Sequence, residues 1–218
     1  IPYPLPWAPL SPEKADPDES ERILLYIGRI APEKGLDALV RAYVALPEEL
    51  RSIWKLRIVG PCEYSRGGGG RSYLGSLRER AAAVASRIEF PGPIFDENQL
   101  RHELSRARLF IYPSLAERGE TFGLAPLEAM SCGCPALVSG LACFKDFIAE
   151  GEDGYTFDHS GHDPSLALNE KLKDLLADPE KLALARPRAL GKASQFEAGS
   201  VADSYLDDFK DLLAGNTA

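Results

Sequence analysis

The chain has 218 residues, of which 44% are hydrophobic and 27% are charged. These fractions are typical of a globular domain, and they exclude a collagen-like chain, a disordered chain and a membrane protein. The formal net charge of −8 argues against a general nucleic-acid-binding or membrane-surface protein, because both need a basic face. The sequence shows no secretory signal peptide and no apolar run near the ~20 residues that cross a bilayer. We therefore expect a cytoplasmic protein.

Prolines dominate the start of the chain, which lacks apolar periodicity. We expect an extended proline-rich linker over residues 1–20 and one folded domain over residues 21–218. Four cysteines are too few for a disulfide scaffold, and they lack the spacing of a zinc site. We expect them to be reduced structural thiols: Cys62, Cys132, Cys134 and Cys143.

Short apolar runs then alternate with segments of helical spacing. The expected strands are 23–27, 56–60, 88–90, 109–112, 136–138 and 155–157. Helical spacing lies between them, including a short helix over 144–150, and continues after residue 163, where Pro187 predicts a break. This alternation indicates an α/β fold, a Rossmann-like doubly wound parallel sheet of about six strands with C-terminal helices.

Ligands of such sheets bind at the carboxyl ends of the strands. After the first strand, Arg29 and Lys34 lie in a turn between Gly28 and Gly35, where both cations can reach a phosphate. The residues alone leave an ordinary exposed turn as the alternative. The P-loop pattern is absent.

The loop after the fourth strand combines backbone donors with carboxylates. Pro126 favours a helix that begins near Gly123, which leaves the preceding amides free for an anion. Glu120 in the loop and Glu128 one turn into the helix can accept hydrogen bonds from vicinal hydroxyls. Acidic residues favoured by the helix dipole are the alternative. Together with the two cations, this set suits a nucleotide sugar better than a dinucleotide, because the G-x-G-x-x-G motif is missing.

These segments resemble the C-terminal, donor-binding half of GT-B glycosyltransferases of the GT4 type. The similarity rests on Gly28-Arg29 with Glu33-Lys34-Gly35 and on the E-x7-E motif from Glu120 to Glu128, which continues into Gly133-Cys134-Pro135. Short glycine-containing signatures at 90–92 and 151–154 also match. The similarity spans about residues 23–214.

The resemblance implies a retaining, metal-independent, hexosyltransferase-like enzyme. Its donor is a nucleotide-diphosphate sugar, with a UDP-sugar as the first expectation, and its acceptor is not identified. Arg29 and Lys34 are implied to bind the diphosphate, Glu120 to lie beside the transferred sugar and Glu128 to hold the ribose. Other implied donor-binding residues are Gly28, Gly60, Pro93, Ile94, Thr121, Phe122, Gly123 and Leu124. No cofactor is expected.

Some features depart from the family pattern. The glycine-rich segment 63–71 looks like an inserted loop, which we expect to be disordered, with a cover over the donor as the alternative. Glu117 competes with Glu120, although only Glu120 has the right offset to Glu128. Asp16-Pro17-Asp18 formally fits a metal-binding D-x-D pattern but lies in the proline-rich segment.

The resemblance also implies that the chain is half of an enzyme. We expect strand order 3-2-1-4-5-6 and, as partners, the nucleotide-sugar donor and an N-terminal acceptor-binding domain of the same parent chain. Any peripheral membrane contact is expected only through that domain, and no nucleic acid is expected. The isolated chain should transfer little or no sugar. A non-catalytic nucleotide-binding module and a GT-B sugar-nucleotide epimerase are the alternatives.

Overall fold

The computed structural model describes residues 3–11 and 22–214. Its centre is a parallel six-stranded sheet with the order β3-β2-β1-β4-β5-β6, which confirms the predicted order. Strands β1, β4 and β5 are buried along almost their whole length, which explains their apolar runs without alternation. The strands are β1 (Ile23–Ile27), β2 (Lys55–Val59), β3 (Ile88–Gly92), β4 (Leu109–Tyr112), β5 (Ala136–Ser139) and β6 (Gly154–Phe157).

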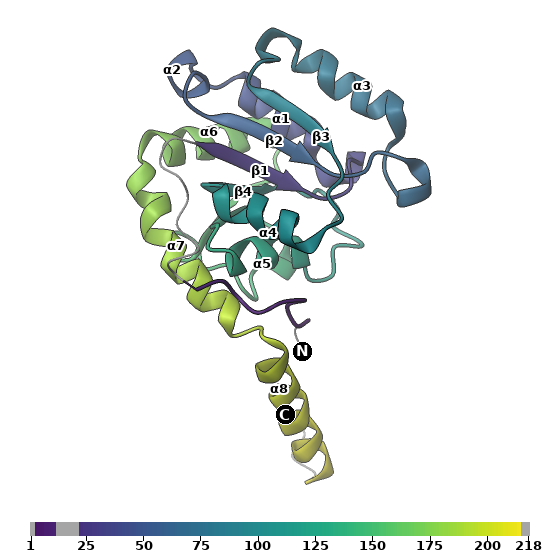
Figure 1. Ribbon diagram of the computed structural model, residues 1–218, viewed down its shortest axis with the longest axis vertical. Helices are drawn as coiled ribbons and strands as arrows, with labels where there is room; N and C mark the ends of the chain where they lie inside the picture. Colours follow the sequence, from purple (N-terminus) through teal and green to yellow (C-terminus); the bar gives the residue numbers. More distant parts are fainter. Residues whose placement is uncertain (1–2, 12–21, 215–218) are drawn as a thin grey trace.

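Helices surround this sheet, and the C-terminal helix α8 extends away from the body (Figure 1). Helix α1 packs with α3 and α6, whereas α5 packs with α4 and α7. The α-helices are α1 (Leu36–Val44), α2 (Glu48–Arg51), α3 (Gly70–Arg80), α4 (Glu97–Arg106), α5 (Leu124–Ser131), α6 (Pro164–Ala177), α7 (Pro179–Ser194) and α8 (Ala198–Leu213). Short 3-10 helices are η2 (Pro32–Lys34), η3 (Tyr64–Arg66), η4 (Ala82–Val84) and η5 (Ala142–Phe144). Within the described ranges, no helix combines the length and the apolar composition needed to span a membrane.

The strand order determines where a ligand can bind. From β1 the chain moves outward to β2 and β3, and it then returns to β4 on the other side of β1. The loops after β1 and β4 therefore leave the sheet in opposite directions, and the crevice between them is the switch point where doubly wound sheets bind ligands.

Two local predictions are wrong. Pro187 does not break a helix, because α7 runs unbroken through it. The carbonyl of Ala183, which loses its partner there, belongs to an exposed residue, and water can take the place of the missing N–H. The segment 144–150 forms turns after η5 and contains no α-helix.

Residues 3–11, the described part of the proline-rich start, form no helix or strand and pack on the domain. The Leu5 N–H donates to the Phe196 carbonyl at 2.8 Å, and the Leu10 N–H donates to the Ser131 carbonyl at 2.8 Å. The Trp7 indole donates to the Ser131 hydroxyl at 2.9 Å. Leu5 is only 5% exposed. These contacts attach residues 3–11 to α5 and to the end of α7, while the linker role of residues 1–20 stays a prediction.

We predict that Leu5→Ala lowers the free energy of unfolding by about 2 kcal/mol, because it empties a buried leucine position. Leu166 is 65% exposed and provides a matched control. Leu166→Ala should cost less than about 0.5 kcal/mol. Urea denaturation of both variants measures the difference. Equal and small effects would show that the first residues do not pack on the domain in solution.

Candidate active site

Backbone hydrogen bonds align the carboxyl ends of the first three strands. The Gly28 N–H donates to the Val59 carbonyl at 3.0 Å, and the Gly60 N–H donates to the Gly92 carbonyl at 3.1 Å. Gly28 and Gly60 therefore lie at one edge, where Arg29 follows β1. Exposed Pro93 and half-buried Ile94 follow β3 at the same edge.

A buried ion pair crosses the switch point. Lys34 Nζ donates to Glu120 Oε2 at 2.7 Å and to the Tyr112 hydroxyl at 2.8 Å. The Ser114 hydroxyl donates to the same Glu120 oxygen at 2.8 Å. The side chains of Lys34 and Glu120 are only 10% and 9% exposed. The structure thus joins two residues that the sequence assigned separately to the phosphate and to the sugar.

Gly35 allows the loop after β1 to come close to the loop after β4. Its φ is +68°, and a Cβ atom there would lie 1.9 Å from the Pro113 carbonyl oxygen. The Leu115 N–H also donates to the Glu33 carbonyl at 2.9 Å. The turn after β1 therefore lies directly on the loop after β4.

The surroundings of Lys34 keep it charged. Burial alone lowers the pKa of its ammonium, but the hydrogen bonds that Lys34 donates to Glu120 and Tyr112 outweigh burial, and the pKa is raised overall. Burial also raises the pKa of Tyr112. Lys34 is therefore a permanent cation at the centre of the crevice.

Arg29 is held by the inserted loop. Its guanidinium donates to the Gly67 carbonyl and forms an ion pair with Glu33 at 3.1 Å. The Arg66 guanidinium lies 4.5 Å from the centre of the Phe95 ring, at the end of the β3 edge. The expectation of a disordered segment 63–71 is therefore wrong. The loop has defined contacts and extends from Arg29 towards the loop after β3.

The N-terminus of α5 follows Glu120. Gly123 is the residue before the helix, with φ +78°, and a Cβ atom there would lie 2.3 Å from the ring of Phe144. Phe122 is buried, with its ring 5.3 Å from that of Phe147. Leu124 is the first helical residue and is 37% exposed. This confirms the predicted helix start, which directs the amides of the first turn towards the carboxyl edge.

A cavity of about 410 Å³ adjoins the ion pair. Three carboxylates line it, namely Glu117, Glu120 and Asp146, and exposed Thr121 lies at its wall. Its remaining lining residues are Ala116, Leu141, Ala142 and Cys143. Glu117 and Glu120, the two candidates for the first glutamate of the E-x7-E motif, therefore line the same cavity. Carboxylates around a small cavity can bind a polyhydroxylated ligand.

Glu128 has a different environment. It lies in α5, is half-buried and is not part of the lining of that cavity. Burial raises the pKa of its carboxyl to about 7. Within the described residues its carboxylate makes no recorded hydrogen bond or ion pair, so it is available to a ligand.

Several site residues were not predicted. Tyr112 and Ser114 hold Glu120, and Asp146 lines the cavity. For Tyr112 and Ser114, the available sequence signal was two hydroxyl-bearing residues at the carboxyl end of a buried strand. Asp146 was not singled out, because the sequence analysis predicted its segment, 144–150, as a short helix.

The four cysteines are free thiols. Burial raises the pKa of Cys132 to about 11 and that of Cys134 to about 12, so both are unreactive packing residues. Across the described ranges, no three His, Cys, Asp or Glu side chains are grouped to hold a metal ion. The D-x-D pattern at 16–18 lies outside the described residues.

Known proteins with similar sequences include several that are named as glycosyltransferases. It is 31% identical over 199 residues to a D-inositol 3-phosphate glycosyltransferase of Thermobispora bispora, which covers 88% of this chain and 44% of that protein. It is 32% identical over 186 residues to the O-antigen chain mannosyltransferase B of Escherichia coli, which covers 85% of this chain and 45% of that protein. The chain thus spans less than half the length of these curated relatives.

Solved structures share the fold. Sucrose-phosphate synthase from Thermosynechococcus elongatus superposes with a TM-score of 0.75 at 24% identity, over 95% of this chain and 52% of that one. Anabaena HepE, in complex with UDP and glucose, superposes with a TM-score of 0.71 at 21% identity, over 88% of this chain and 48% of that one. Residues 9–192 match the family model described as Glycosyl transferases group 1. Because this match covers most of the chain, the chain belongs to the Glycosyl transferases group 1 family.

Proposed function

We propose that this chain is the donor-binding half of a retaining, metal-independent hexosyltransferase that uses a nucleotide-diphosphate sugar, with a UDP-sugar as the first candidate. The observation that carries the proposal is the Lys34–Glu120 contact at the switch point, beside a cavity lined by carboxylates. The relatives are glycosyltransferases by name, and the related HepE structure contains UDP and glucose.

The main contribution of this chain to the proposed reaction is to stabilise the negative charge of the leaving diphosphate. When the bond between sugar and diphosphate breaks, negative charge grows on the leaving diphosphate. The cations of Arg29 and Lys34 and the first amides of α5 lie at the edge where that charge forms. Such preorganised donors lower the barrier electrostatically, and they supply the charge that a metal ion supplies in other transferases.

The carboxylates recognise hydroxyls in the proposed complex. Glu120 and its neighbours at the cavity accept hydrogen bonds from the sugar, and Glu128 accepts them from the ribose. Gly28, Gly60, Pro93 and Ile94 border the nucleotide at the ends of β1 to β3. Thr121 and the backbone of residues 122–124 contact the phosphate or the sugar.

An acceptor-binding domain completes the proposed enzyme. Helix α8 exposes an apolar stripe that the described residues of this chain leave uncovered, and Val201 is the only buried residue of the helix. The stripe consists of Tyr205, Leu206, Phe209, Leu212 and Leu213, which are between 39% and 90% exposed. Helix α8 begins close to the described residues 3–11, because the Leu5 N–H donates to the Phe196 carbonyl two residues before the helix. A domain that precedes residue 3 can therefore reach the stripe and cover it.

We predict that Arg29→Ala weakens UDP binding about tenfold, because one charge-assisted hydrogen bond to the diphosphate is lost. Uridine binding should stay unchanged. Calorimetry with UDP, GDP and ADP, with and without added metal, measures these affinities and identifies the base. Exposed Arg188→Ala is the charge-matched control. If Arg29→Ala affected uridine and UDP equally, Arg29 would not bind the diphosphate.

Glu128→Gln should bind uridine and UDP more weakly, yet fold more stably above neutral pH. The folded pKa of Glu128 is about 7 against an ordinary 4.5, so the folded chain holds the proton more tightly than the unfolded chain. Stability is therefore lost as the pH rises between these two values, and the loss reaches at most about 3 kcal/mol. Glutamine removes this loss. Urea denaturation at pH 4.5 and pH 8 tests it.

Exposed Glu49 provides the control for that pH comparison. Glu49→Gln should shift stability by the same small amount at both pH values. A Glu128→Gln variant that behaves in the same way would show that Glu128 is not buried in solution.

The isolated chain should bind UDP but release none from a UDP-sugar when acceptors are supplied, because the acceptor side of the cleft is missing. A coupled assay for UDP release from UDP-glucose and UDP-N-acetylglucosamine measures this. Appreciable transfer by the isolated chain would overturn the two-domain proposal.

A further inference from the structure

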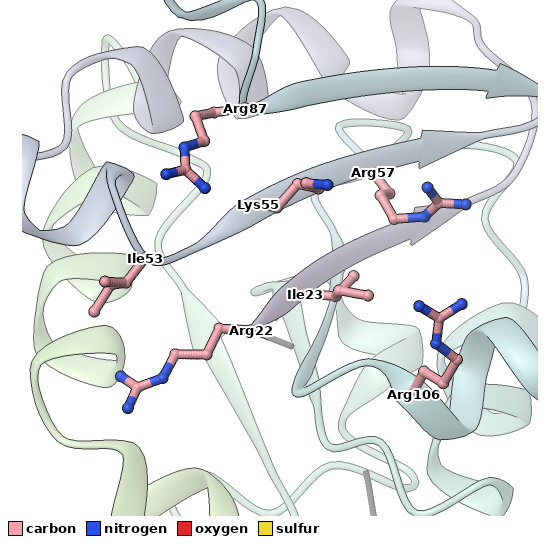
Figure 2. A pocket seen from close by; sticks show the side chains of 7 residues that line it. All are labelled: Arg22, Ile23, Ile53, Lys55, Arg57, Arg87 and Arg106. Carbon is pink, nitrogen blue, oxygen red and sulfur yellow. The ribbon is translucent and has the colours of Figure 1, made fainter. Parts of the chain in front are cut away.

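A basic cavity lies at the opposite edge of the sheet from the donor crevice. It has a volume of about 250 Å³, and its lining contains five cations and no carboxylate. Figure 2 shows its side chains around the amino-terminal ends of β1, β2 and β3, with one arginine contributed by the end of α4. The lining residues are Arg22, Ile23, Ile53, Lys55, Arg57, Arg87 and Arg106.

The backbone places three of these cations side by side. The Lys55 N–H donates to the Arg22 carbonyl at 2.9 Å, and the Leu56 N–H donates to the Arg87 carbonyl at 2.9 Å. Lys55 is the first residue of β2, and Arg22 and Arg87 directly precede β1 and β3, so the three residues lie at the amino-terminal ends of neighbouring parallel strands. Like charges at this spacing repel one another unless an anion lies between them.

Part of this charge is compensated within the chain. Lys55 forms an ion pair with Glu89 at 2.9 Å, and Arg57 forms one with Glu103 on α4 at 3.0 Å. These contacts leave Arg57 only 19% exposed and hold it in place.

Arg22 and Arg87 are not compensated in this way. No carboxylate of the described residues forms an ion pair with either side chain. The Arg22 guanidinium lies instead 5.7 Å from the centre of the Trp54 ring. Arg22 and Arg87 thus border the cavity with donors that no described carboxylate accepts, whereas ion pairs hold Lys55 and Arg57.

We propose that this cavity binds a phosphoryl group, separately from the donor site. Guanidinium groups recognise phosphate oxygens in a bidentate manner, and several of them around a small hollow favour a compact, multiply charged anion. The five-residue strands place this edge about 15 Å from the carboxyl edge, so one diphosphate cannot reach both. The chain carries a net charge of −8, which makes a concentration of five cations a local feature of this edge.

The phosphoryl group can belong to a small free anion or to a lipid headgroup. Ile53 is 47% exposed at the cavity, and an apolar residue beside arginines is also suited to a phospholipid surface. Both sources present the same chemistry to Arg22 and Arg87. The experiment must therefore separate them.

Titration of the ¹⁵N-labelled chain with pyrophosphate tests the site residue by residue. Amide signals of Arg22, Lys55 and Arg87 should shift together, whereas binding at the donor crevice moves the signals of residues 122–124. Shifts confined to the donor crevice would overturn the proposal unless the lipid arm shows specific binding. The second arm measures cosedimentation with vesicles of phosphatidylglycerol and, for comparison, of phosphatidylcholine.

Charge removal provides the decisive comparison. Arg87→Gln should weaken the interaction about tenfold, and the double change with Arg22→Gln should abolish it, because each arginine supplies a charge-assisted bond. Arg188→Gln is the matched control and should bind like the original chain. If the double variant unfolds, the Arg87→Gln variant alone tests the proposal, because within the described residues the Arg87 side chain makes no recorded hydrogen bond or ion pair.

The outcomes distinguish the sources. Amide shifts with pyrophosphate but no cosedimentation indicate a free phosphate compound as the ligand. Cosedimentation with phosphatidylglycerol that the double variant loses indicates a lipid headgroup. If neither arm shows binding, or if the Arg87→Gln variant binds like Arg188→Gln in both, the cavity is not a phosphoryl site.

Discussion

The buried contact between Lys34 and Glu120 is the interaction on which the site depends. It joins the loop after β1 to the loop after β4, across the point where the strand order reverses. A buried ion pair is a weak source of stability, because removing two charges from water offsets most of their attraction. Lys34 also donates to the Tyr112 hydroxyl and the Ser114 hydroxyl donates to Glu120, so both members of the pair have a further hydrogen-bond partner. The fold therefore keeps a charged pair at the one place where a doubly wound sheet binds its ligand.

In the proposed complex, the Lys34–Glu120 contact connects the phosphate side of the site with the sugar side. Glu120 and Tyr112 engage two of the three donors of the Lys34 ammonium. A diphosphate that takes more than the remaining donor would draw Lys34 away from Glu120. Glu120 would keep its bond from Ser114 and gain an acceptor position for a hydroxyl in the adjoining cavity. Phosphate binding and sugar recognition would then be coupled through one pair of side chains.

Much of the fold could be predicted from the sequence, because it depends on local signals. Buried strands show as apolar runs, as β1, β4 and β5 do. The parallel alternation then leaves few topologies, and the predicted order is confirmed. Both members of the central ion pair could also be assigned to the correct edge.

The side-chain contacts could not be predicted in the same way, because they join distant parts of the chain. Lys34 and Glu120 are 86 positions apart, and nothing local indicates that they touch. The glycine run at 67–70 suggests flexibility, yet Gly67 and Gly70 have positive φ angles and form tight turns. The Gly69 N–H donates to the Ile30 carbonyl at 2.8 Å. Glycine composition reports the freedom of the unfolded chain, whereas the folded loop is determined by partners that lie elsewhere in the sequence.

The net charge of this chain says little about which ligands it binds. The average of −8 argues against an extended basic surface, yet cations gather at two edges of one sheet: Arg29 and Lys34 at one edge and five cations at the other. At the carboxyl edge Lys34 is paired with the Glu120 carboxylate, which a diphosphate would displace in the proposed complex. At the amino edge Glu89 and Glu103 compensate two cations, and Arg22 and Arg87 remain without a carboxylate partner among the described residues. The first arrangement favours a ligand that offers hydroxyls to the displaced carboxylate as well as phosphates to the lysine. The arrangement at the amino edge requires only negative charge in its ligand. If both proposed sites exist, the sheet therefore binds a nucleotide sugar at one edge and a simple phosphate at the other.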